Sequence, residues 1–345
     1  VRFFGDFNSN EFLFSLENLK SRWNKQYVFH RQSLLTYSDF FSYDIYKTFD
    51  NQLLARYSYP FDEVRSFRVT PSLRAVTTVA LSTGRLSSLS AEDVREYWSG
   101  VTIEYVFDNV LPIELNIYNG SRVKVFAEVF EQVRKSPTYL FTCGFDARHY
   151  QKIHRNIIFA SRAAYSFSHG TSPLLYYLGS VDNWINLSLQ TPKFDATKEY
   201  DRTVNWAYQS LGANMRGFQQ NVRNGPSFAL VNNEIRIPIV RYFANRPIKS
   251  DFLSSFQIIS FFDVGGAWYG LYPGAQENAY NYSIIGDLTT SPVQITIDEM
   301  RQVFVYGYGY GVRSRLFGYF LRLDWAYGKD DGVLQKLFYL SLSLD

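Results

Sequence analysis

Apolar and polar side chains alternate with a period of two along most of this chain of 345 residues, whereas helical periodicity is rare. The alternation is clearest in 319–327, where apolar residues fill the odd positions and Arg322 and Asp324 lie between them. Successive side chains of a β-strand point to opposite faces, so such segments are predicted to be strands with one apolar and one polar face. The same pattern occurs in 67–75, 101–108, 123–129, 157–167 and 334–345.

Strand length decides between the two folds that such strands build, a soluble sandwich and a membrane barrel. The alternating runs reach about 10 to 14 residues, whereas a tilted strand needs ~9–11 to cross a bilayer and soluble strands average ~5–6. Arg and Glu recur on the polar faces, and a second packed layer would bury these charges without partners. The sequence therefore predicts an all-β fold, a transmembrane antiparallel β-barrel.

Aromatic residues make up 18% of the chain, with 27 Tyr and 30 Phe, and they gather toward the predicted strand ends. Tyr and Trp at strand ends are typical of the interfacial girdles of a membrane barrel. The residues concerned are Tyr57, Tyr59, Trp98, Tyr105, Tyr139, Trp268, Tyr269, Trp325 and Tyr327.

The connections between the predicted strands alternate between short and long, which is typical of outer-membrane barrels. About 13 strand candidates can be counted, whereas bacterial single-chain barrels have an even number of strands. We therefore expect a further strand near Val1 or N-terminal strands outside this chain, and no second domain within 1–345. The short turns are 59–62 and 328–332, and the long loops are 82–97, 168–227 and 270–299.

Composition argues against several other classes of protein. A net charge of +3 gives no footprint for nucleic acid. The single cysteine excludes an intrachain disulfide, and the four histidines show no zinc-site spacing. No apolar run is long enough for a transmembrane helix. No nucleophile elbow or paired carboxylates occur, so we expect no catalytic residue, no metal and no cofactor.

Arg216, beside Gly217 and Phe218 in a long polar loop, is the side chain that most needs a partner. Inside a pore its charge would require a carboxylate, and bidentate pairing is the strong form of that contact. Asp263, in the second strand after the loop, is the most plausible partner, and Gly217 allows a tight turn. The alternative is an ordinary solvated arginine.

Several short stretches between residues 100 and 345 occur in a familiar order and spacing. They are Leu178-Gly179, Met215 to Phe218, NEIRIPI at 233–239, FFDVG at 261–265, GYGYGVR at 307–313 and LRLDWAY at 321–327, preceded by EYVFDN at 104–109 and GSR at 120–122. Together they resemble the C-terminal barrel of the outer-membrane protein assembly and two-partner secretion superfamily, the BamA/TamA/FhaC-like barrels. The aromatic richness of the whole chain resembles that of the Bacteroidetes members of this superfamily.

The resemblance implies a barrel of 16 strands in the full protein, located in the bacterial outer membrane. Residues 182–226 would form a loop inserted into the lumen. The tip motif of Arg216, Gly217 and Phe218 would face the FxDxG strand, where Asp263 pairs with Arg216 and Gly265 follows. The glycine face formed by Gly307, Gly309 and Gly311 suits a loop packed against the wall.

The resemblance also implies the function: insertion or translocation of proteins at the outer membrane, without covalent chemistry. The last strand would form one side of a seam, through Phe338, Leu340, Leu342 and Leu344. The expected partners are outer-membrane lipid, client outer-membrane or secreted proteins, and accessory subunits. A scaffold barrel of a larger complex, a passive pore and an outer-membrane hydrolase are the alternatives.

Overall fold

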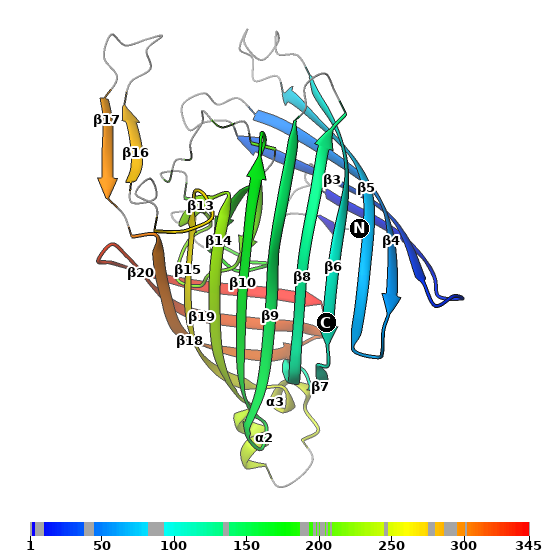
Figure 1. The fold of residues 1–345 in the computed structure, drawn as a ribbon. Helices are drawn as coiled ribbons and strands as arrows, with labels where there is room; N and C mark the ends of the chain where they lie inside the picture. The colour runs from blue at the N-terminus through cyan, green and yellow to red at the C-terminus, as the bar shows by residue number, and fades with distance from the viewer. Residues whose placement is uncertain are drawn as a thin grey trace. The chain divides into compact units, whose positions relative to one another are not determined.

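The computed structural model consists almost entirely of β-strands (Figure 1). Residue contacts divide the chain into two compact units. The first comprises Val1–Phe107, Val125–Cys143 and Gly170–Ser172, and the second comprises Asp108–Lys124, Gly144–His169 and Pro173–Asp345. The structure describes residues 2–3, 10–37, 45–81, 93–133, 138–186, 193–195, 198, 200, 204, 206–207, 209–244, 248–274, 280–285, 295–300 and 302–344.

Among these residues, one antiparallel sheet contains 14 strands in the order β1-β2-β3-β4-β5-β6-β8-β9-β10-β14-β15-β18-β19-β20, with β7 paired to β8. The order follows the sequence, as expected for strands joined as successive hairpins. The bounds of the first ten strands are β1 Arg2–Phe3, β2 Asn10–Asn18, β3 Asn24–Tyr37, β4 Ile45–Pro60, β5 Arg65–Leu81, β6 Val94–Asp108, β7 Leu111–Glu114, β8 Ile117–Gln132, β9 Tyr139–His154 and β10 Ile157–Gly170.

Strands β3 to β6 of the first unit have 14 to 17 residues. Their apolar side chains alternate onto an exposed face, where Leu53, Leu73 and Val101 are 56, 58 and 41% exposed. Among the described residues of this unit, these side chains pack against no second layer, which argues against the sandwich alternative. The predicted loop 82–97 is too long at its end, since β6 already begins at Val94.

The second unit contains the wall strands from β10 onward, which pair antiparallel in the order β10-β14-β15-β18-β19-β20. Side chains alternate between a buried and an exposed face, as predicted. In β19, Asp324 and Ala326 are buried at 3 and 2%, whereas Trp325 between them is 38% exposed. The further wall strands are β14 Ser227–Ile237, β15 Gln257–Trp268, β18 Phe304–Leu316, β19 Tyr319–Asp330 and β20 Val333–Leu344.

Two predicted long loops contain secondary structure of their own. Within 168–227, β11 (Leu175–Leu178), β12 (Gln209–Ala213) and β13 (Arg223–Gly225) form a small sheet in the order β12-β11-β13. In the predicted loop 270–299, β16 (Tyr280–Ile285) pairs with β17 (Ile295–Met300), which extends one residue beyond that loop. These strands have three to six residues, too few for alternation to identify them.

Two helices of one turn follow β14, namely α2 (Ile239–Phe243) and α3 (Asp251–Ser254), and they lie at the ends of β14 and β15 (Figure 1). Ser250 caps α3 by accepting the Leu253 N–H. Among the described residues, none of the helices has the length and apolar character that crossing a membrane requires.

Candidate functional site

The segment between β10 and β14, residues 171–226, is termed the inserted segment. Its first part is an apolar run, and β11 is buried at every residue. There the Tyr176 ring contacts Phe228 of β14 edge-on at 4.9 Å, and its hydroxyl lies 2.8 Å from the Ser166 hydroxyl of β10. Strand β11 therefore packs on the buried face of β10 and β14, which cover its apolar side chains.

The tip of the inserted segment is formed by Met215 to Phe218. Met215 and Phe218 are fully buried, and Gly217 has a φ of 96°. That conformation strongly favours glycine, which explains the residue that the sequence places there. Gly265 of β15, one of the predicted site residues, makes room for the tip, because a side chain there would crowd Met215 and Leu230.

The wall beneath the tip lacks side chains at the points of closest approach. A methyl group at Gly307 would overlap the Arg216 carbonyl oxygen, and one at Gly328 would overlap that of Gly217. Gly307 lies between Asp263 and Gly328 in the strand register. The predicted glycine face therefore meets the tip at Gly307, whereas Gly309 and Gly311 accommodate Phe261 and Asp324 of the wall.

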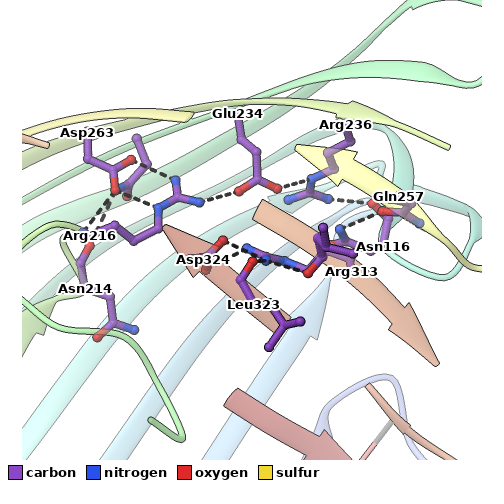
Figure 2. A network of polar contacts seen from close by, with 12 residues as sticks. Asn116, Asn214, Arg216, Glu234, Arg236, Gln257, Asp263, Arg313, Leu323 and Asp324 are labelled. Atoms are coloured by element: carbon purple, nitrogen blue, oxygen red, sulfur yellow. Dashed lines mark hydrogen bonds and ion pairs between the residues drawn. The ribbon is translucent and has the colours of Figure 1, made fainter. Parts of the chain in front are cut away.

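Arg216 points from the tip to two carboxylates of the wall (Figure 2). Its Nε and Nη2 atoms contact the two oxygens of Asp263 at 2.8 Å each, and its backbone N–H donates to Asp263 Oδ2 at 3.1 Å. Nη1 contacts Glu234 Oε2 at 2.6 Å. The guanidinium also lies 3.8 Å from the centre of the Phe261 ring. The contact suggested by the resemblance is thus present, in the bidentate form.

Burial and charge act in opposite directions on Arg216. Burial alone lowers the pKa of its guanidinium, but the charge and hydrogen bonds of Asp263, with the charge of Glu234, outweigh burial and raise the pKa above its ordinary value. Asp263 is 0% exposed, so the pair is shielded from solvent. Arg216 is therefore a permanent cation within this site.

The ion pair continues into a network that sequence reasoning missed (Figure 2). Glu234 Oε1 accepts from Arg236 Nε at 2.8 Å, and Arg236 Nη1 donates to the Asn116 carbonyl at 2.7 Å. On β18 and β19, Arg313 and Asp324 form a bidentate pair at 2.7 and 3.0 Å. The period-two positions of Glu234 and Arg236 were the available signal, because they place both side chains on one face.

The tip also contacts the last strand of the sheet. The Gly217 N–H donates to the Tyr339 hydroxyl at 3.1 Å, and this hydroxyl donates to the Phe218 carbonyl at 2.7 Å. Tyr339 is fully buried, on the opposite face of β20 from Phe338 and Leu342, which are 43 and 37% exposed. Two of the predicted seam residues thus face outward, Leu340 is partly buried, and the Leu344 side chain lies outside the described residues.

A second ion pair holds the C-terminal end of the inserted segment. Arg223 of β13 contacts Asp330 of β19 at 2.6 and 3.2 Å and donates to the Gln302 carbonyl at 2.8 Å. Arg223 and Asp330 are each 6% exposed. In the part of the chain that the structure describes, no group of His, Cys, Asp and Glu could hold a metal ion.

No protein-family model matches the chain, and no curated protein matches it. Solved structures do. BamA from Haemophilus ducreyi lacking POTRA domains 1–3 aligns with a TM-score of 0.58 and 10% identity, over 97% of this chain and 62% of that one. CdiB from Acinetobacter baumannii aligns at 0.51 and 11%, over 96 and 50%. CdiB from Escherichia coli aligns at 0.54 and 8%, over 97 and 52%.

The fold is that of the BamA and CdiB barrels. The resemblance noted in the sequence is thereby confirmed at the level of fold, an antiparallel β-barrel, since identities of 8 to 11% carry no finer statement. The chain spans only 50 to 62% of the length of these structures. The figure of 16 strands for the full protein stays a prediction.

Proposed function

We propose that the chain is an outer-membrane barrel that inserts or translocates proteins at the bacterial outer membrane without covalent chemistry. The observation that carries the proposal is the docked tip of the inserted segment. Arg216 is held by Asp263 and Glu234 of the wall, and the tip backbone is hydrogen-bonded to Tyr339 of β20. The fold shared with BamA and CdiB supports the same function.

A barrel can promote insertion by offering backbone hydrogen bonds. Each unsatisfied N–H or C=O group of a strand in lipid costs several kcal/mol, so an incoming strand crosses the bilayer readily only beside a partner. Strand β20 ends the sheet order, and its Phe338 and Leu342 face outward. In this proposal its edge forms one side of the seam at which a client strand pairs.

The ion pair of Arg216 would hold the inserted segment in the lumen and keep the wall strands in register. Asp263 and Glu234 lie on adjacent strands β15 and β14, and Arg216 bridges them from the tip. Loss of this ion pair would release the tip from the wall and break its hydrogen bonds to Tyr339. The proposed partners are outer-membrane lipid, client proteins and accessory subunits.

The proposal is tested by reconstituting the purified chain in vesicles and supplying a denatured outer-membrane barrel protein. We expect client insertion to exceed that of empty vesicles, and to fall at least tenfold in Arg216→Ala and Asp263→Ala. Arg65→Ala is the matched control, because its ion pair with Asp62 lies in an exposed turn. Co-purification of partner proteins without insertion would indicate a scaffold barrel. Ion conductance without insertion would indicate a passive pore.

A further inference from the structure

The inserted segment makes a second contact with β20, along the backbone of that strand. The Ile185 N–H donates to the Leu340 carbonyl at 2.7 Å, and Trp184 and Ser341 form an isolated antiparallel bridge. Strand β19 pairs with β20 over its whole length, and among the described strands β20 is the last in the sheet order. Because backbone groups of a strand point alternately to its two edges, residues 184–185 occupy the edge opposite β19.

The Trp184 side chain anchors this contact on the buried face. Its ring meets that of Tyr339 edge-on at 5.0 Å, and it is only 7% exposed. Ile259, Phe261 and Ala326 complete the cluster around it. Trp184 and Ser341 lie opposite each other, and both side chains are buried. The bridge is therefore held by packing as well as by a backbone hydrogen bond.

The contact is nevertheless short. Asn183, the residue before Trp184, has a φ of 55°, in the left-handed region that a strand cannot adopt. Pairing with β20 therefore stops at Trp184 on that side. Asn183 and Ile185 are exposed, Ile185 at 38%. A longer strand could take the Leu340 carbonyl and add further hydrogen bonds along the same edge.

We propose that Trp184 and Ile185 are an internal occupant of a strand-binding edge on β20, and that an extended segment of another chain binds there by displacing them. The ligand is a polypeptide strand antiparallel to β20 with a bulky apolar side chain opposite Ser341. This inference rests on the proposed function, because it names the regulation of the seam. The tethered occupant competes at an effective concentration on the order of millimolar, so only a longer or better-fitting strand displaces it.

The first test locks the occupant in place. Trp184→Cys and Ser341→Cys are combined in a Cys143→Ser background, since directly opposite strand residues have Cβ atoms about 4.5–5.5 Å apart and can approach disulfide geometry. We expect oxidation to link the two cysteines and lower client insertion at least tenfold, and reduction to restore it. Trp184→Cys with Cys143→Ser is the control, in which oxidation should change nothing. Full insertion by the locked chain would overturn the inference.

The second test needs no client. The probe is a fluorescent peptide of residues 180–186, SVDNWIN, added to the purified full chain. Ile185→Pro removes the N–H that donates to Leu340, so this variant is expected to bind the peptide at least tenfold more tightly than the unchanged chain. Ile185→Val keeps the donor and should match the unchanged chain. A peptide N-methylated at the Ile185 position should not bind.

Equal peptide affinity of the unchanged chain and folded Ile185→Pro would overturn the inference. If Ile185→Pro does not fold, the cysteine pair decides instead: the reduced form should bind the peptide and the oxidised form should not. If no form of the chain inserts clients, the proposed function fails, yet the peptide result still decides whether residues 184–185 cover the edge.

Discussion

A few residues at the tip make several of the contacts that hold the inserted segment to the wall. Arg216 contacts two carboxylates on two strands, and Gly307 and Gly328 let the backbone of Arg216 and Gly217 approach the wall. Breaking a buried ion pair from one side is costly, because the charge that remains has lost both water and partner.

Arg216→Ala is expected to destabilise the barrel by about 3–5 kcal/mol, since it leaves Asp263 buried without its cation, whereas Glu234 keeps its contact with Arg236. The double variant Arg216→Ala with Asp263→Ala should lose less stability than the two single variants together, because removing both partners leaves neither charge of the pair without its counterion. The temperature at which each variant loses its heat-resistant gel mobility measures the stability of the single and the double variants. Additive losses would show that the two residues do not act as a pair.

Gly307→Ala is expected to destabilise the docked tip by about 1–3 kcal/mol, because the added methyl group overlaps the Arg216 carbonyl. The matched control is Gly274→Ala, since a side chain there would meet no atom within 4 Å and the backbone is not strained. Limited proteolysis of the inserted segment measures the effect. Equal protection in both variants would contradict the close contact.

At the scale of elements, β20 is tied to the inserted segment at two places, through the Tyr339 hydroxyl and through the Leu340 carbonyl. Most of the wall could be predicted from the sequence, because strands of a dozen residues repeat the two-residue period often enough to be read. The small sheet β12-β11-β13 could not, because its strands are short and its cover comes from β14 and β15.

Tyr339→Phe is expected to loosen the tip by about 1–3 kcal/mol, because the Gly217 N–H and the Phe218 carbonyl lose a shared partner in a buried position. Tyr310→Phe is the control, since that side chain is 53% exposed on β18. Hydrogen exchange at Gly217 reports the change. Unchanged exchange in Tyr339→Phe would show that the hydroxyl does not hold the tip.

For the whole molecule, the sequence predicted the barrel fold and, by resemblance, the contact of Arg216 with Asp263. The partners Glu234, Arg236 and Tyr339 could not be assigned, because their contacts depend on how the tip lies against strands distant in sequence. The bridge between Trp184 and Ser341 could not be predicted for the same reason, since 157 positions separate its two residues.

Deleting residues 182–226 is expected to raise ion conductance in planar bilayers, because the inserted segment is predicted to fill the lumen. Arg223→Ala should raise the conductance less, since it removes the contacts with Asp330 and Gln302 but leaves the segment in place. Single-channel recording distinguishes the two. Conductance that is equal in the deletion variant and the unchanged chain would place the segment outside the conducting path.

The Tyr339 hydroxyl has one further consequence, for the chain's own folding. It both accepts from Gly217 and donates to Phe218, so it has a dedicated place in the finished wall. A slip of β20 by one residue would bring Phe338 or Leu340 to that place, and neither side chain has a polar atom. All the remaining side chains of the strand would also turn to the wrong face. The hydrogen bonds between Tyr339 and the tip thus favour the observed register of the final strand over a slip of one residue.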